Sequence, residues 1–258
     1  MAARSAGKPA APLPEVNFSD FAGIRYLHLG TEWVQGSMKL SAPYEIELDY
    51  VQRMMAWLLF VEPASVGKLH AMQLGLGAAS LTKFSRKVLR MRTTAVELNP
   101  QVVAACRGWF KLPPEDTKLE IVMADAGVEV RNPRWHGNVD ALQVDLYDHE
   151  AAAPVLDSEG FYADCRELLA DGGSMTVNLF GRSSTYAESL ARIVGAFGED
   201  AVWAFKPTRE GNTVVLARRQ ADRPSRALLA DRAQSIQTRW SLPAPKWLRV
   251  FKPIKPIA

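Results

Sequence analysis

Residues 68–100 read KLHAMQLGLGAASLTKFSRKVLRMRTTAVELNP, and they set the expected fold class. Two short apolar runs at 68–74 and 93–98 alternate with a stretch of helical spacing near 79–90. Asn99 then supplies a cap residue, and a proline follows it at the first position of a second helix. This order of strand, helix, strand and helix predicts parallel strands covered by helices.

The same alternation continues to residue 218. Further strands are expected at 118–124, 139–145, 174–180, 201–207 and 212–218, and helices near 157–170 and 184–197. The turn Arg209-Glu210-Gly211 makes the last two strands a hairpin, which adds an antiparallel edge. The prediction is an α/β chain with a class I methyltransferase-like Rossmann fold, whose mostly parallel sheet has seven strands.

Outside this region the pattern predicts smaller parts. Apolar residues alternate over 24–41, which predicts a small N-terminal β-meander, and helical spacing follows over 45–61. A last helix is expected near 224–240, and the Pro-rich end is expected to be loose. We therefore expect four segments: a disordered leader (1–20), the meander and its helix (21–62), the Rossmann-like catalytic domain (63–220), and a C-terminal helix with a basic tail (221–258).

Composition and charge limit the class of protein. The 258 residues are 48% hydrophobic, which suits one large domain. The densest apolar run, Met54 to Val61, is too short for a membrane span, and no secretory signal is expected, so we expect a cytoplasmic protein. Residues 218–258 hold ten Lys and Arg against two Asp and Glu, so a net charge of +3 leaves −5 for the rest. An acidic body suits a cationic ligand, and contact of the basic tail with nucleic acid is not expected.

Three features after consecutive strands form a candidate nucleoside site. Gly75 and Gly77 let the backbone turn tightly next to a ligand. Glu97 ends the second strand, where a carboxylate can accept hydrogen bonds from ribose hydroxyls. Asp125 and Ala126 follow the third strand, where a carboxylate and a backbone N–H can contact adenine. The combination favours an adenosyl-sulfonium ligand over NAD, although each feature alone also fits an ordinary strand end.

Two carboxylates follow the fourth strand. Asp145 and Asp148 leave the sheet edge three residues apart. One carboxylate could accept the proton of an amine nucleophile, and the other could bind a distant ammonium by a charge-assisted hydrogen bond. The alternative is that Asp145 merely ends the strand and Asp148 caps the next segment.

These motifs resemble those of spermidine synthases, and the resemblance covers residues 25–218. That family carries a D-x-x-D block followed by an aromatic pair on a helix, and this chain has DLYDHEAAAPVLDSEGFYADCRELL. Upstream, Gln35-Gly36-Ser37 and Tyr50 match a Gln turn and a helical Tyr of the family. The resemblance implies an N-terminal β-domain, a homodimer, and aminopropyl transfer from decarboxylated S-adenosylmethionine to an amine such as putrescine.

The resemblance also implies roles for individual residues. Gln35 would contact the donor, and Tyr50 would place the amine beside Asp145, the proposed base. Asp148, with Tyr147 next to it, would bind the amine substrate. Gly75, Gly77, Glu97, Asp125 and Ala126 would hold the thio-adenosine.

Two departures from the family pattern keep other functions open. Ala78 stands where the family's glycine loop has an aspartate that selects the decarboxylated donor, and Arg209 aligns with a Tyr and would suit a carboxylate-bearing acceptor. A second hypothesis is therefore a methyltransferase that uses intact S-adenosylmethionine. A third is a non-catalytic homologue that binds a nucleoside or a polyamine. No metal is expected, because no His or Cys cluster has ligand spacing.

Overall fold

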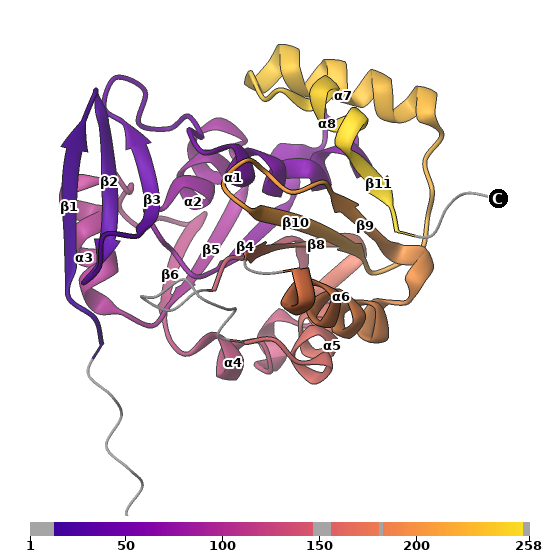
Figure 1. Cartoon of the computed structure of the whole chain (residues 1–258), viewed down its shortest axis with the longest axis horizontal. Coiled ribbons are helices and arrows are strands. Elements are labelled where there is room, and N and C mark those ends of the chain that lie inside the picture. Colours follow the sequence, from indigo (N-terminus) through magenta and orange to yellow (C-terminus); the bar gives the residue numbers. More distant parts are fainter. Residues whose placement is uncertain (1–12, 147–155, 181–182, 255–258) are drawn as a thin grey trace, which may run out of the picture.

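The computed structural model describes residues 13–146, 156–180 and 183–254. Their main body is one eight-stranded sheet in the order β11-β9-β10-β8-β7-β4-β5-β6, shown in Figure 1. The parallel strands are β4 (His70–Leu74), β5 (Arg92–Glu97), β6 (Leu119–Met123), β7 (Val139–Val144) and β8 (Leu169–Phe180). The antiparallel edge consists of β9 (Val202–Phe205), β10 (Asn212–Arg218) and β11 (Phe251–Pro253).

Helical segments cover both faces of this sheet. Most of them lie at the positions that the sequence pattern predicts. They are α1 (Asp49–Arg53), η1 (Met54–Phe60), η2 (Val66–Lys68), α2 (Ser80–Lys83), η3 (Phe84–Val88), α3 (Pro100–Trp109), α4 (Ala126–Glu129), η4 (Pro133–Trp135), α5 (Glu159–Leu168), α6 (Ser183–Phe197), η5 (Glu199–Ala201), α7 (Arg226–Trp240) and α8 (Ala244–Val250). The predicted class I methyltransferase-like architecture is confirmed, with eight strands instead of seven.

Side chains that alternate along the central strands build two cores. Ala71 and Ala141 face a core shared with η1, α7 and α8, whereas Met72 and Leu142 face a core shared with α4, α5 and α6. Both faces of a parallel sheet are therefore apolar, which explains why the strands read as continuous hydrophobic runs. Helices of the C-terminal region and of the region before β4 thus cover the same face.

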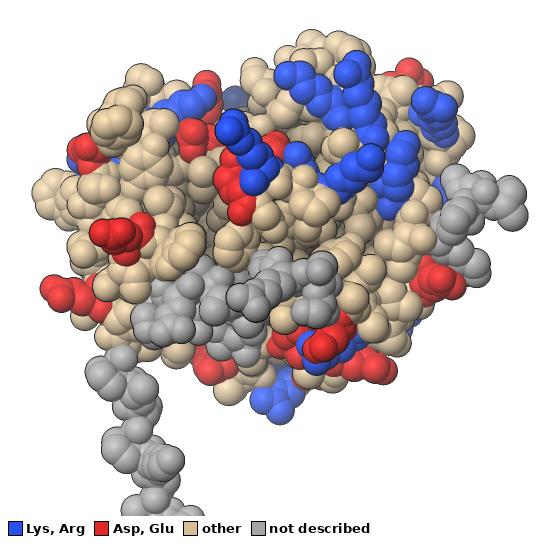
Figure 2. All heavy atoms as spheres, viewed as in Figure 1, with Lys and Arg blue, Asp and Glu red and all other residues tan. Residues whose placement is uncertain are grey.

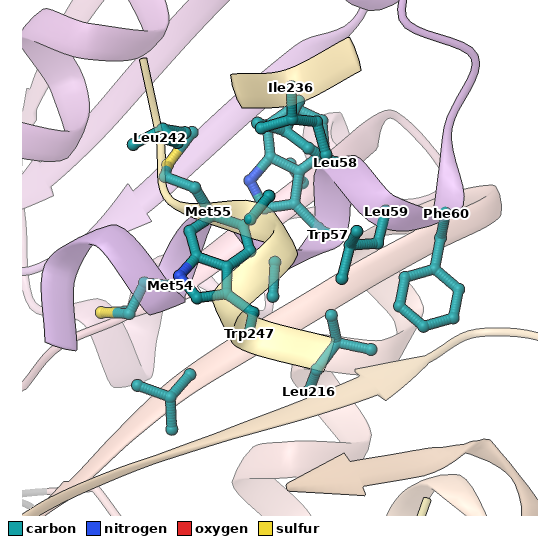
Figure 3. Close-up of a cluster of buried hydrophobic side chains, with 14 of the residues drawn as sticks. Met54, Met55, Trp57, Leu58, Leu59, Phe60, Leu216, Ile236, Leu242 and Trp247 are labelled. Carbon is teal, nitrogen blue, oxygen red and sulfur yellow. The ribbon is translucent and has the colours of Figure 1, made fainter. Parts of the chain in front are cut away.

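The apolar run Met54–Phe60 lies at the centre of the first core. All seven of its residues are buried. Figure 3 shows Trp57 and Leu58 close to Ile236, and Trp247 beside Met54 and Met55. The last helices therefore pack on the body of the protein, as their apolar face predicts.

Two strands at sheet edges, β1 (Val16–Phe21) and β11, lie where the sequence predicted a disordered leader and a loose C-terminal end. β1 pairs with β2 (Ile24–Leu29), which pairs with β3 (Val34–Lys39), so the meander begins inside the expected leader. Phe18 anchors β1, because its ring lies 5.1 Å from that of Trp109. The Pro-rich end is not loose up to residue 253, because β11 pairs with β9 and Phe251 stacks on Phe205 at 4.6 Å.

The charge asymmetry is visible on the surface. Figure 2 shows Lys and Arg side chains gathered over the region of α7 and α8. Within the described ranges, no helix combines the length and apolar character needed to cross a bilayer.

Candidate active site

A cavity of about 780 Å³ opens at the carboxyl ends of β4, β5 and β7. The chain runs from β4 outward to β6 and then returns to β7 on the other side of β4, so the strand order reverses between β4 and β7. Open α/β sheets bind ligands at such a reversal. The β-meander, the segment before α1 and the first turn of α1 also line the cavity, with Gln35 and Tyr50 among the lining residues.

The glycine loop after β4 is held by backbone contacts on both sides. Gly75 has φ +84° and donates its N–H to the Val96 carbonyl at 2.9 Å. A Cβ atom on Gly75 would lie 2.3 Å from the Asp145 carbonyl oxygen, and one on Gly77 would lie 3.0 Å from the Gln35 carbonyl oxygen. Only glycine fits at position 75, because both the positive φ and the close approach exclude a side chain.

Glu97 links this loop to the end of β5. Its carboxylate accepts the Leu76 N–H and the Asn99 N–H, each at 2.8 Å. Burial raises the pKa of Glu97, and the backbone hydrogen bonds from Asn99 and Leu76 act in the opposite direction. A carboxylate fixed in this way has further lone pairs for hydroxyl groups of a ligand.

Asp125 lies two residues after the end of β6 and is the N-cap residue of α4. Its side chain accepts the Gly127 N–H at 2.7 Å and so caps the helix, with Ala126 buried directly after it. Both residues line the cavity, together with Leu156, whose side chain lies next to Gly127. The three predicted nucleoside-binding positions therefore face one space, although nothing in the fold alone tests their roles.

Asp145 follows β7 and lies at the base of the cavity. The Tyr50 hydroxyl donates to one of its carboxylate oxygens at 3.4 Å, and the Asn178 amide donates to the other at 3.0 Å. Asn212 in turn donates to the Asn178 side-chain oxygen at 3.2 Å. Burial raises the pKa of Asp145 to about 6, against the lowering effect of both hydrogen bonds. This value suits a general base near neutral pH.

The remaining predicted residues have different outcomes. Tyr147 and Asp148 lie outside the described residues. Arg209 is exposed and is not among the residues that line the cavity, whereas its neighbour Glu210 is. A contact of Arg209 with a substrate therefore stays a prediction, and Glu210 is the residue of this turn that lines the cavity.

The charge of the cavity is negative. Besides Glu97 and Asp125, the carboxylates that line it are Glu32, Glu47, Asp49, Asp145 and Glu210, and the described lining residues include no Lys, Arg or His. Arg53 pairs with Asp49 at 2.7 Å but does not itself line the cavity. Such a space favours cationic ligands and disfavours carboxylates.

The sequence reasoning missed Asn178 and Asn212. Asn178 is 4% exposed within the apolar strand β8, and a buried amide inside such a strand requires partners. The asparagine in the stretch SMTVNLF (174–180) could therefore have indicated this site residue from the sequence.

We expect Asn178→Ala to shift the acidic limb of the pH profile upward. Loss of its hydrogen bond to the Asp145 carboxylate favours the protonated form and raises the pKa of Asp145 above about 6. If Asp145 is the base, as predicted from the sequence, kcat should also fall by roughly 10-fold, because the carboxylate loses one orienting contact. The measurement is kcat/KM against pH, with Asn212→Ala as a matched variant that touches Asp145 only through Asn178. An unshifted limb in Asn178→Ala would contradict this role.

Comparison with known proteins gives the family. No family model matches the chain. A polyamine aminopropyltransferase of Neisseria meningitidis is 37% identical over 205 residues, which are 79% of this chain and 76% of that protein. The chain belongs to the polyamine aminopropyltransferase family.

Solved structures confirm the fold of this aminopropyltransferase. A probable spermidine synthase from Corynebacterium glutamicum matches with a TM-score of 0.70 and 19% identity, covering 89% of this chain and 88% of that chain. Human methyltransferase-like protein 13, in complex with SAH, matches with a TM-score of 0.68 and 18% identity, covering 76% and 93%. The aminopropyltransferase therefore shares the methyltransferase-like fold, and its small antiparallel sheet precedes that fold in the chain.

Proposed function

We propose that this protein transfers an aminopropyl group from decarboxylated S-adenosylmethionine to an amine such as putrescine. One observation carries the proposal: Asp145, with its partners Tyr50 and Asn178, lies in a cavity that also exposes Glu97 and Asp125. Membership in the family supports the reaction type.

The proposed chemistry needs a base and an oriented amine. A primary amine has a pKa near 10, so it binds as an ammonium and must lose a proton before it attacks. In the proposed step the amine nitrogen forms a bond with the methylene carbon next to the sulfonium. The carbon–sulfur bond breaks, its electron pair stays on the sulfur of methylthioadenosine, and the proton passes to Asp145. The sulfonium is already a good leaving group, so the protein mainly positions the reactants.

Each predicted residue has a place in this proposal. Glu97 would hold the ribose, Asp125 and Ala126 the adenine, and Gly75 and Gly77 the sulfonium side of the donor. Tyr50 would orient the amine beside Asp145. Asp148 remains the predicted partner of the acceptor's distant ammonium.

The negative lining favours this reaction over methyl transfer. Intact S-adenosylmethionine carries a carboxylate, and the described lining residues offer it no cationic side chain. The decarboxylated donor and a diamine are both cations without a carboxylate, so both suit the space.

The test is product formation by the full chain. We expect putrescine and decarboxylated S-adenosylmethionine to yield spermidine and methylthioadenosine, measured by mass spectrometry. With intact S-adenosylmethionine we expect a kcat/KM at least about 100-fold lower, corresponding to the loss of one or two charge-assisted contacts. Methylated product from the intact donor, without spermidine from the decarboxylated one, would reject aminopropyl transfer in favour of the methyltransferase hypothesis.

We also propose that the protein is a homodimer in the cytoplasm. The resemblance to spermidine synthases supports the dimer, and Phe21, 75% exposed at the end of β1, offers a large apolar side chain for a contact through the β-meander. The two cysteines, Cys106 and Cys165, are buried and free, as suits a reducing compartment.

A further inference from the structure

The glycine loop contributes no side-chain carboxylate to the cavity. Ala78 is 2% exposed and is not among the lining residues. A Cβ atom on Gly36 would lie 2.7 Å from both the Cβ and the N of Ala78, so this position is pressed against β3. Ala78 therefore offers no group that could contact an ammonium in the cavity.

Hydrogen bonds through Ser37 connect the carboxylate of Glu47, from another segment, to this loop. Glu47 lies between β3 and α1, is half-buried and lines the cavity. Its Oε2 accepts a hydrogen bond from the Ser37 hydroxyl at 2.7 Å, and the Ser37 carbonyl oxygen accepts one from the Ser80 hydroxyl at 2.9 Å. Ser80 begins α2, directly after the loop, so two hydrogen bonds connect the Glu47 carboxylate to the loop's end.

The other carboxylates fit this place less well. Asp49 is exposed and paired with Arg53 at 2.7 Å. Glu32 and Glu210 are exposed, and no hydrogen bond within the described ranges ties either of them to the glycine loop. Glu47 Oε1 makes no hydrogen bond in the part of the chain that the structure describes, so one oxygen of a fixed carboxylate is available to a ligand.

We propose that Glu47 determines donor specificity by binding the terminal ammonium of the aminopropyl group. This inference rests on the proposed function and adds a residue to it. An ammonium donates to Glu47 Oε1 in a charge-assisted hydrogen bond, whereas a donor that keeps its carboxylate brings two negative charges together. Glu47 thereby selects the decarboxylated donor. The glycine loop has no side chain for this role, because it carries Ala78.

The test compares three ligands by calorimetry on the full chain. They are decarboxylated S-adenosylmethionine, intact S-adenosylmethionine, and methylthioadenosine, which lacks the amine. We expect Glu47→Gln to weaken binding of the decarboxylated donor by roughly 10- to 100-fold, as expected for one charge-assisted contact. Methylthioadenosine should bind within about twofold of wild type, and the preference for the decarboxylated over the intact donor should collapse.

The matched control is Glu45→Gln, two residues earlier. Glu45 is exposed, pairs with Lys39 at 3.4 Å and does not line the cavity, so all three affinities should stay at the wild-type level. Ser37→Ala keeps the carboxylate but removes its anchor, and it should give a smaller loss for the decarboxylated donor alone.

Failures of the two proposals are distinguishable. If the wild-type protein binds the decarboxylated donor no better than methylthioadenosine and makes no spermidine, the proposed function fails. If the wild type prefers that donor and Glu47→Gln keeps the preference, the role of Glu47 is overturned. Equal losses for the donor and for methylthioadenosine in Glu47→Gln would also overturn it, because they would show a purely structural residue.

Discussion

Replacement of Asp145 by Asn is expected to lower kcat by about 100- to 10,000-fold, the range for loss of a positioned general base. Asn is close in size to Asp: its oxygen can accept the hydrogen bond of the Asn178 amide, and its NH2 group can donate to the Tyr50 hydroxyl oxygen, where Asp145 accepts from both. It cannot accept the proton of the attacking amine. Affinity for methylthioadenosine should change little, because Glu97 and Asp125 are untouched. The measurements are single-turnover spermidine formation and calorimetric binding.

The pH dependence should identify Asp145 as the group that is lost. Burial raises its pKa to about 6, so the free protein should gain activity as the pH rises through that value. We expect kcat/KM of the wild type to show a limb near pH 6, and Asp145→Asn to lack it. Activity of Asp145→Asn equal to that of the wild type would refute the proposed base.

The same pKa shift predicts a gain in stability for Asp145→Asn. The ordinary value for Asp is 3.8, so between 3.8 and about 6 the folded state binds more protons than the unfolded state. Stability therefore falls as the pH rises through this window, and the penalty persists above it. Because the carboxylate faces an open cavity, we expect Asp145→Asn to recover only about 1–2 kcal/mol at pH 8, measured by denaturant unfolding. Loss of stability at pH 8, together with loss of methylthioadenosine binding, would show that the variant misfolds.

The central strands could be predicted because both of their faces are buried. Each of β4, β5 and β7 is a short run of mostly buried residues that ends at a polar or glycine position, and this pattern is local. β1 was missed because most of its residues are exposed, and β11 was missed because it has only three residues and ends at Pro253. What holds them is packing of Phe18 on Trp109 and of Phe251 on Phe205, which are distant in sequence.

The candidate site, too, could be predicted only in part from the sequence. Gly75, Glu97 and Asp125 could be located from the sequence, because the ends of parallel strands meet at one edge of the sheet. Tyr50, 95 residues before Asp145, was placed beside it only through the resemblance to a known family, and Asn178, 33 residues after it, was missed. Contacts between such positions depend on how the segments pack.

Two further features could be found only from the structure: the hydrogen bond that holds the Glu47 side chain, and which residue of the turn before Gly211 lines the cavity. Ser37 donates to Glu47, and the neighbouring Gly36 packs on Ala78 of the glycine loop, two contacts that the sequence does not indicate. Arg209 and Glu210 are neighbours, and sequence alone does not say which of them faces the cavity.

Replacement of Gly75 by Ala is expected to remove both stability and activity. The new Cβ would lie 2.3 Å from the Asp145 carbonyl oxygen and 3.2 Å from a Leu146 side-chain carbon. Since φ is +84°, the residue also pays a left-handed strain of about 1–2 kcal/mol. With the forced displacement of the chain after β7, the total loss of unfolding free energy should be about 2–5 kcal/mol. Activity should fall at least about 100-fold, because a shift of about 1 Å at the base is enough for that.

Gly198→Ala is a control that introduces backbone strain at a positive φ without the steric clash expected for Gly75→Ala. Gly198 has φ +83° and ψ 144°, a conformation that non-glycine residues adopt only with strain, but a Cβ atom there would meet nothing within 4 Å. We therefore expect Gly198→Ala to lose only the strain contribution and to keep the wild-type kcat/KM. The difference between the two variants in urea unfolding measures the close approach of the glycine loop to Asp145. If both variants lost the same stability and kept the same activity, the backbone contact at Gly75 would not position the base. If Gly75→Ala alone lost activity, the loop that faces the donor and the strand that carries Asp145 would act as one rigid unit.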